Sequence, residues 1–498
     1  MFEAAEIGHE VSDEQYEKEV PDLRAELLET QYAVKEKGTF PILVLIAGVD
    51  GAGKGETVNA LHEWMDPRHI RTAAFGPPTE EERNRPRMWR FWMALPPRGQ
   101  IGILFHSWYT EPIVDRVWRR MRRTELEAAA SEIRRFEEML AAEGVLILKF
   151  WFHLSKEDQE RRLREIDRDK KRTWKVTKAD WKQFKKYDDY YSVSEHVLRL
   201  TSTSHAPWIV VEGKDANYRE LTVGRTLLDA MRKRLAGETG PPASVKPRPT
   251  IERSVDHRDI LTELDLSPSV TEEKYKDELL KWQGRLNRLA RDDRFARIAV
   301  TVAFEGMDAA GKGGAIRRIA GALDARQYEV IPIAAPTEEE RARPYLWRFW
   351  RRLPLKGRMS IYDRSWYGRV LVERVEGLSS DADWMRAYDE INDFEQQLHE
   401  SGVVVVKIWM HISQDVQLER FHERENTRFK RFKITPEDWR NREKWDAYQG
   451  AAADMLERTS TEIAPWVLVE ANDKKFARIK VLKTIVRRIE RALEGQQK

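Results

Sequence analysis

The chain has 498 residues, more than one hydrophobic core usually organises, so its length predicts two domains. Lys and Arg number 87 against 84 Asp and Glu, and the resulting net charge of +3 lacks the basic excess typical of nucleic-acid binding. The absence of cysteine excludes disulfides, thiol catalysis and Cys-bound zinc. No apolar stretch approaches the ~18 residues of a membrane span and the N-terminus is acidic and polar, so we expect a cytoplasmic protein that binds neither nucleic acid nor a membrane.

Both halves of the chain contain the same succession of apolar runs of strand length. The runs lie at 42–47, 101–105, 145–152 and 208–211, and again at 298–304, 359–362, 403–410 and 466–469. They are continuous rather than alternating, which predicts central strands of a parallel sheet buried on both faces. Charged amphipathic segments such as 383–400 lie between them and indicate helices. This order predicts doubly wound α/β domains with ligand sites at the carboxyl ends of the strands.

The second half repeats the first without an insertion. The Pro-Thr-Glu-Glu-Glu-Arg segment at 78–83 recurs at 336–341, a shift of 258 positions that also superposes two Trp-rich motifs. We therefore predict a first domain of residues 1–236, a Pro-rich linker of residues 237–258 and a second domain of residues 259–498.

A Gly-rich segment directly follows the strand predicted at 298–304. It reads Gly306-Met307-Asp308-Ala309-Ala310-Gly311-Lys312-Gly313-Gly314 and precedes a helix expected at 315–323. In such a turn, backbone N–H groups, the helix N-terminus and a lysine converge on phosphate oxygens. The segment therefore predicts a phosphate-binding loop of a P-loop kinase-like domain, with Gly306, Gly311, Gly313 and Gly314 as binding residues and Lys312 as the charged group. The first copy has the same frame from Gly48 to Gly55.

The loop lacks the hydroxyl that usually follows its lysine. That Ser or Thr helps to hold Mg²⁺, whereas this chain has Gly313. We therefore predict Asp308 and Asp363 as metal ligands, because Asp363 ends the strand at 359–362 and carboxylate oxygens suit Mg²⁺. Arg364 and Arg369 follow and could neutralise phosphoryl charge. The alternatives are a turn-capping role for Asp363 and solvated arginines.

A short Arg-rich segment begins at the Pro-Thr-Glu-Glu-Glu-Arg motif of the second half. Thr337 and Glu340 predict a capping box at a helix start, and Pro344 interrupts the helix. We predict a helical lid over phosphates in which Arg341 and Arg348 bind the ligand. A solvated charged face is the alternative.

A second basic stretch, residues 420–433, combines cations with phenylalanines. Arg420, Arg424 and Lys433 are its candidate phosphate-binding residues. Phosphate chains and nucleic-acid backbones are both polyanions, so this pattern does not separate them.

These motifs together resemble the polyphosphate kinase 2 family, and the duplicated layout resembles its two-domain polyphosphate:AMP phosphotransferase branch. The matching segments are 306–314, Tyr-Asp-Arg-Ser-Trp-Tyr at 362–367, Pro336-Thr337, and Thr-Ser-Thr at 459–461 before Ala-Pro-Trp at 464–466. The resemblance implies a thymidylate-kinase-like parallel sheet flanked by helices in each of two tandem domains, each with a helical lid. It also implies Mg²⁺-dependent phosphoryl transfer between inorganic polyphosphate and a nucleoside mono- or diphosphate. The catalytic residues would be Asp308, Lys312, Asp363 and Arg364.

The first copy departs from this pattern at the site. Phe105 and His106 replace Asp363 and Arg364, and Ala47 and Glu56 replace Glu305 and Gly314. Loss of a carboxylate ligand and gain of a negative charge at an anion site predict that the first domain is inactive or nearly so. Its basic segment 161–186 could retain a role in polyanion binding or assembly.

The duplicated layout implies AMP as the acceptor, giving ADP. Because an AMP phosphate oxygen is already anionic, in-line transfer needs no general base, in keeping with the lack of an evident His or Cys constellation. Other hypotheses are an ADP or GDP acceptor, an ATP-dependent small-molecule kinase, or a noncatalytic polyanion-binding protein, which would not need the carboxylates. The sequence leaves open purine selectivity, the favoured direction and whether the chain forms a homo-oligomer.

Overall fold

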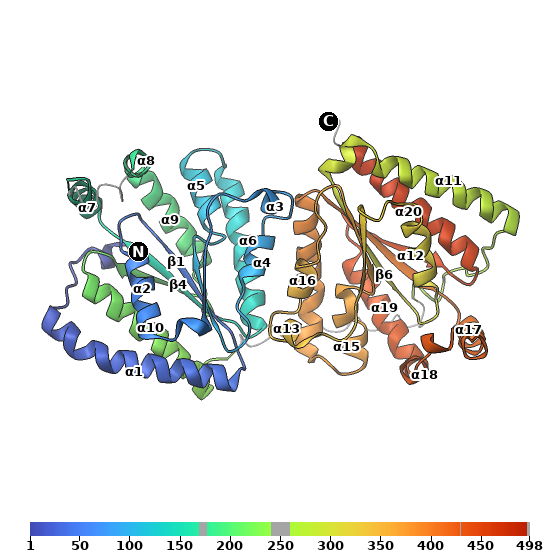
Figure 1. Cartoon of the computed structure of the whole chain (residues 1–498), viewed down its shortest axis with the longest axis horizontal. Helices are drawn as coiled ribbons and strands as arrows, with labels where there is room; N and C mark the ends of the chain where they lie inside the picture. The colour runs from blue at the N-terminus through green and yellow to red at the C-terminus, as the bar shows by residue number, and fades with distance from the viewer. Residues whose placement is uncertain (169–176, 241–258, 429, 496–498) are drawn as a thin grey trace. The chain divides into compact units, whose positions relative to one another are not determined.

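The computed structural model describes residues 1–168, 177–240, 259–428 and 430–495. Its chain divides into two compact units, one made chiefly of residues 1–244 and the other chiefly of residues 245–498 (Figure 1). Most of the linker predicted at 237–258 and part of the basic segment 161–186 lie outside the described residues.

Each unit is built on one five-stranded sheet in which all paired strands are parallel. The first sheet has the order β2-β3-β1-β4-β5 and the second the order β10-β9-β6-β8-β7. The strands are β1 (Ile42–Gly48), β2 (Ile70–Ala74), β3 (Ile101–Phe105), β4 (Leu146–His153), β5 (Trp208–Glu212), β6 (Ala299–Gly306), β7 (Tyr328–Pro332), β8 (Met359–Asp363), β9 (Val403–His411) and β10 (Trp466–Glu470). The predicted α/β fold with two parallel sheets is confirmed.

Helices cover both faces of each sheet. In the first half they are α1 (Asp13–Lys37), α2 (Lys54–Trp64), α3 (Glu80–Arg83), α4 (Trp89–Ala94), α5 (Thr110–Val117), α6 (Arg123–Ala142), α7 (Lys156–Arg168), α8 (Lys178–Phe184), α9 (Tyr187–Thr201) and α10 (Ala216–Ala236). In the second half they are α11 (Glu272–Ala290), α12 (Lys312–Ala320), α13 (Glu338–Arg341), α14 (Trp347–Trp350), α15 (Val372–Val375), α16 (Asp381–Glu400), α17 (Gln414–Asn426), α18 (Pro436–Glu443), α19 (Trp445–Thr459) and α20 (Lys474–Gly495). In the first unit α1, α2 and α10 pack on one face and α5, α6 and α9 on the other (Figure 1).

All eight apolar runs predicted as strands are strands, but the sequence missed β2 and β7. Both are edge strands, and each buries a single side chain, Ile70 in one and Ile331 in the other. A strand with one buried position gives neither a continuous apolar run nor a clear alternation, so the pattern that revealed the central strands was absent.

Each unit also buries an ion pair between its sheet and a helix. Lys149 of β4 donates to Glu137 of α6 at 2.7 Å, and Lys407 of β9 donates to Glu395 of α16 at 2.8 Å. All four side chains are fully buried. Burial lowers the pKa of Lys407 and raises the pKa of Glu395, so each charge depends on its partner.

Within the described part of the chain, no helix is both long enough and apolar enough to cross a bilayer.

The order of the strands places the two Gly-rich loops. β1 and β6 are the central strands: the next two strands of the chain lie on one side of each (β2 and β3, or β7 and β8), and the last two lie on the other side (β4 and β5, or β9 and β10). The carboxyl end of such a strand is the point at which open α/β sheets bind ligands.

Candidate functional site

The Gly-rich loop of the second copy leaves β6 and enters α12 with a backbone that requires glycine. Gly306 has φ of 140°, and a Cβ built there would lie 2.2 Å from the carbonyl oxygen of Met410 on β9. Gly311 has φ of 106° and caps α12, which begins at Lys312, three residues before the predicted start. The Lys312 ammonium donates to the Gly306 carbonyl at 2.7 Å and so lies folded along the loop.

The next two glycines leave space at the helix start. Nothing lies within 4 Å of a Cβ built at Gly313, whereas a Cβ at Gly314 would lie 3.3 Å from the Arg478 guanidinium. The helix N-terminus is therefore open on one side and has an arginine on the other. This arrangement suits an anion.

Asp308 lies inside the loop with both carboxylate oxygens occupied. One accepts from Arg364 at 3.2 Å and the other from the side-chain amide of Asn441 at 2.9 Å. Burial acts to raise the pKa of Asp308, but the charges of Lys312 and Arg364 outweigh it, so the pKa lies below its ordinary value. Asp308 is therefore ionised at neutral pH.

Asp363 and Arg364 follow β8 at the neighbouring strand end. Asp363 pairs with Phe304 of β6 in the sheet register, which places it beside the loop, as predicted. Its carboxylate makes no hydrogen bond or ion pair with the residues that the structure describes. Arg364 has φ of 65°, a left-handed backbone that is strained for a residue with a side chain. This turn directs the guanidinium to Asp308.

The carboxylates at this site are suited to Mg²⁺, which is bound partly by water and substrate, and not to a metal that is enclosed by protein ligands. Among the described residues, no group of three or more His, Cys, Asp or Glu side chains could enclose an ion. Mg²⁺ commonly binds through one or two carboxylates, waters and substrate phosphates. Asp308 and Asp363 supply two such carboxylates at adjacent strand ends, so these residues fit the ion.

Two residues that the sequence did not indicate support these groups. Asn441, from α18, lies 133 positions from the aspartate that it contacts. Glu305 is buried beneath the loop and accepts from both the backbone N–H and the hydroxyl of Ser365, at 2.7 and 2.8 Å. Burial raises the pKa of Glu305. The departure of the first copy at this position, where Ala47 stands, was the available signal for Glu305.

A basic cavity of ≈ 350 Å³ opens beside the loop. Eight cationic side chains and a single carboxylate, Glu423, line it together with Gly311 and Gly314. The cations are Arg317, Arg318, Arg420, Arg424, Lys430, Lys433, Lys474 and Arg478. The structure thus brings the predicted Arg420, Arg424 and Lys433 together with the loop. The sequence missed the contributions of α12 and α20, because cations on an amphipathic helix look like a solvated face.

Arg420 differs from the other cations because it is buried and bound to backbone. Its guanidinium donates to the carbonyls of Ala309 and Ala310 in the loop, at 3.0 and 3.2 Å, and to two carbonyls after β10. Burial lowers its pKa to about 10. Arg420 therefore fixes the shape of the loop as well as lining the cavity.

Three predicted phosphate-binding arginines have other partners. Arg341 donates to the Pro336 carbonyl at 2.6 Å, Arg348 to the Ala334 carbonyl at 3.0 Å, and Arg369 pairs with Glu373 at 2.8 Å. None of them lines the basic cavity. The capping box at the start of α13, between Thr337 and Glu340, is present as predicted.

The first copy has the same Gly-rich loop as the second, but different side chains surround it. Lys54 donates to the Gly48 carbonyl at 2.7 Å, as Lys312 does to the Gly306 carbonyl, and its ammonium lies 3.6 Å from the Asp50 carboxylate. His106 takes the position of Arg364 with the same left-handed backbone, φ 55°. Glu56 pairs with Arg219 at 2.8 Å and Arg162 at 3.1 Å, so its carboxylate neutralises cations at the helix start.

Comparison with known proteins assigns the family. The model of the family described as polyphosphate kinase 2 matches residues 10–238 and again residues 269–497. The chain belongs to the polyphosphate kinase 2 family. The family resemblance of the sequence motifs is thereby confirmed, with a family domain in each half of the chain.

Relatives within this family match the whole chain. A polyphosphate:AMP phosphotransferase of Pseudomonas aeruginosa is 53% identical over 492 residues, covering 99% of both chains. A polyphosphate:AMP phosphotransferase of Acinetobacter johnsonii is 39% identical, covering 94% of this chain and 95% of its own. The crystal structure of a putative polyphosphate kinase 2 from Pseudomonas aeruginosa superposes with a TM-score of 0.90 at 52% identity, covering 99% of each chain. The duplicated polyphosphate kinase 2 fold is therefore common to this chain and its relatives.

Proposed function

We propose that this protein is a polyphosphate:AMP phosphotransferase that transfers a phosphoryl group from inorganic polyphosphate to AMP in its second domain. The full-length relatives that share its two-domain layout carry this activity in their names. The observation that carries the proposal at the level of the site is the eight-cation cavity that opens on the Gly-rich loop, the same loop whose Asp308 binds Arg364.

The cavity and the loop have separate tasks. A polyphosphate chain bears a charge on every phosphate and suits a groove lined by cations from α12, α17 and α20. Its terminal phosphate would reach the loop, where Lys312 and the N-terminus of α12 favour an anion. Arg317 and Arg478 are thus expected to bind polyphosphate, in addition to the predicted Arg424 and Lys433.

The chemical step is an in-line displacement at the terminal phosphorus. An AMP phosphate oxygen forms the new P–O bond as the bridging P–O bond to the chain breaks, and the shortened chain leaves as an anion. Lys312 and Arg364 offset the negative charge that spreads over the transferred group. Mg²⁺, when bound, would be held by Asp308 and Asp363 and would neutralise phosphate charge. Asn441 and Arg364 keep Asp308 ionised and oriented before substrate arrives.

The proposal is tested by supplying the full chain with polyphosphate and Mg²⁺ plus AMP, ADP, GMP or GDP, and identifying the nucleotide products. ADP formed from AMP is the expected result. Faster product formation from ADP or GDP would reassign the acceptor. Phosphorylation with ATP but not with polyphosphate as donor would replace the proposal with a small-molecule kinase.

A further inference from the structure

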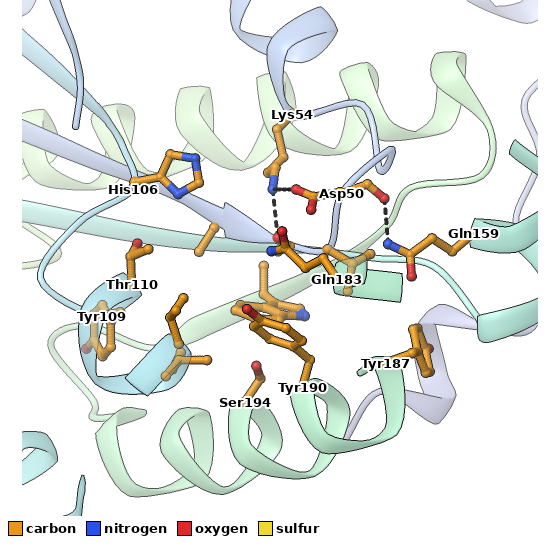
Figure 2. A pocket seen from close by; sticks show the side chains of 16 residues that line it. Asp50, Lys54, His106, Tyr109, Thr110, Gln159, Gln183, Tyr187, Tyr190 and Ser194 are labelled. Atoms are coloured by element: carbon orange, nitrogen blue, oxygen red, sulfur yellow. Dashed lines mark hydrogen bonds and ion pairs between the residues drawn. The ribbon is translucent and has the colours of Figure 1, made fainter. Parts of the chain in front are cut away.

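The first copy, although it lacks the catalytic carboxylate, has a cavity of its own beside its Gly-rich loop. The loop, β4, α5 and α9 line it, and most of its lining is apolar or aromatic (Figure 2). Lys54 reaches into it from the loop, opposite Tyr190 and Ser194 of α9 (Figure 2). The centre of a water molecule can reach ≈ 90 Å³ within it, several times the ≳ 10–15 Å³ that one water needs. The cavity therefore admits a small organic group.

Two buried polar atoms on the wall of this cavity have no hydrogen-bond partner among the described residues. They are the Ser194 hydroxyl and the indole N–H of Trp151, whose side chains are 0% and 6% exposed. Buried polar atoms are nearly always paired, so the unpaired Ser194 hydroxyl on the wall of this cavity indicates a missing partner. The second copy has Ala452 in place of Ser194. The indole of Trp409 donates to the Nδ1 atom of His411 at 3.4 Å, whereas the indole N–H of Trp151 and the Nδ1 atom of the equivalent His153 both lack a partner among the described residues.

The helix start beside this cavity is closed to a phosphate chain. Glu56 occupies the mouth of the loop and pairs with Arg162 and Arg219, the latter fully buried. The second copy has Gly314 at this point, so no carboxylate stands there, and cations line its basic cavity. A long polyanion would have to displace the internal carboxylate, so it is not the ligand of the first copy.

The remaining features describe a ligand with a flat ring and one anionic group. Tyr190 and Trp151 offer aromatic surface, and the unpaired Ser194 hydroxyl can bond to the edge of a heteroaromatic ring. Lys54 supplies a cation on the wall of the cavity, which Glu56 does not line; its ammonium also donates to the Gly48 carbonyl and lies 3.6 Å from the Asp50 carboxylate.

We infer that the first copy is a noncatalytic nucleotide-binding site that takes a nucleoside monophosphate, with the base in the aromatic cavity and the phosphate at Lys54. The choice of AMP as the specific ligand rests on the proposed function. Phe105 and His106 stand where the second copy has Asp363 and Arg364, so the bound nucleotide is not phosphorylated there.

Hydrogen–deuterium exchange of the full chain with AMP, in the absence of polyphosphate, tests the inference locally. AMP is expected to slow exchange in peptides covering residues 48–54 and 187–197. Ser194→Trp, which fills the cavity, should abolish this protection while protection at 306–312 persists. Tyr190→Leu removes the ring that would stack on the base. It should raise the AMP concentration that gives half of the maximal protection from exchange roughly 10-fold or more. Unchanged exchange in β4 and α6 shows that each variant is folded. If Ser194→Trp does not fold, the Tyr190→Leu variant alone tests the inference.

The two copies report separately. Protection of 306–312 without protection of 48–54 and 187–197 overturns the inference, as does first-copy protection that both variants leave unchanged. Protection in the first copy alone supports the inference and counts against the proposed acceptor. Absence of protection in both copies overturns the inference.

Discussion

Asp308 is the residue on which the proposed catalytic site converges. It receives Arg364 from the end of β8 and Asn441 from α18, and Lys312 lies one helical turn further along the same loop. The site is thus arranged around one carboxylate with a lowered pKa, and Asp363, at the end of the neighbouring strand β8, lies beside it. In the proposed mechanism both carboxylates hold the metal, and they differ in that Asp308 is already oriented by Arg364 and Asn441.

Asp308→Asn and Asp363→Asn are each expected to lower turnover roughly 10²–10³-fold, the scale of losing one group that stabilises transition-state charge. The fold should persist, since each change is isosteric. Steady-state assays of ADP formation measure the effect, with Asp389→Asn on the exposed face of α16 as the matched control. A rate near that of the native chain in either site variant would refute its assignment as a metal ligand.

Arg364→Gly should separate activity from stability. Glycine accepts the left-handed backbone at φ 65° without strain, so the unfolding temperature should stay within a few degrees of the native value, while turnover falls with the loss of the guanidinium. Thermal unfolding and the turnover assay are measured on the same sample. A large loss of stability would mean that the Arg364–Asp308 pair chiefly holds the fold.

At the scale of elements, each sheet is connected to a helix by a buried ion pair that no sequence pattern indicated. Lys407 also donates to the Tyr367 hydroxyl at 2.9 Å, and the indole of Trp366 donates to Glu395 at 3.0 Å. The Ser-Trp-Tyr motif shared by both copies is therefore part of the connection between sheet and helix, not part of the basic cavity.

Lys407→Met is expected to destabilise the second domain by about 3–5 kcal/mol, because it leaves the Glu395 carboxylate buried without a counter-charge. The double variant Lys407→Met, Glu395→Met should recover much of that loss, since an apolar pair of similar size removes the orphaned charge. Urea unfolding of the three proteins checks the order. Equal losses in the single and double variants would contradict this account of the pair.

The end of β9 should make the second domain sensitive to acid. Burial lowers the pKa of His411 to about 4, from an ordinary value of 6.5. Between pH 4 and pH 6.5 the His411 ring is protonated in the unfolded chain but not in the folded chain. The free energy of unfolding therefore falls as the pH drops from 6.5 to 4, by roughly 3 kcal/mol. Above pH 6.5 the effect is absent.

His411→Gln keeps a hydrogen-bond acceptor for Trp409 and has no titrating ring. Its stability should exceed that of the native chain by a margin that grows between pH 6.5 and pH 4, as measured by urea midpoints at each pH. A constant difference across that interval would show that His411 titrates normally.

At the scale of the whole molecule, duplication has given two loops with nearly the same backbone and different surroundings. The first is closed by Glu56, and the second opens on a basic cavity. A family domain is present in both halves, so the difference lies in a few side chains and not in the fold.

Lys312→Ala in the full chain should therefore remove nearly all polyphosphate-dependent formation of ADP, even though the first loop and its lysine are intact. Activity above about 1% of native would exceed the 10²-fold loss typical of removing such a group and would indicate a working first domain. Circular dichroism of the variant serves as the folding control.

The sequence by itself determined the duplicated α/β fold, the central strands, the two loops and the family, because these rest on local patterns. Continuous apolar runs, invariant spacing between copies, and glycines whose backbone tolerates no Cβ are all visible along one stretch of chain. The loss of the carboxylate in the first copy was visible in the same way, since Phe105 aligns with Asp363.

Only the tertiary structure decided which side chains meet. Asn441 and Arg478 reach the loop from more than a hundred residues away, Arg420 turns to backbone carbonyls, and Arg341, Arg348 and Arg369 bind elsewhere. The direction of a long charged side chain depends on partners contributed by other elements, and composition leaves those partners unknown. The aromatic cavity of the first copy is of the same kind, because the loop, β4, α5 and α9 enclose it only when they are packed together.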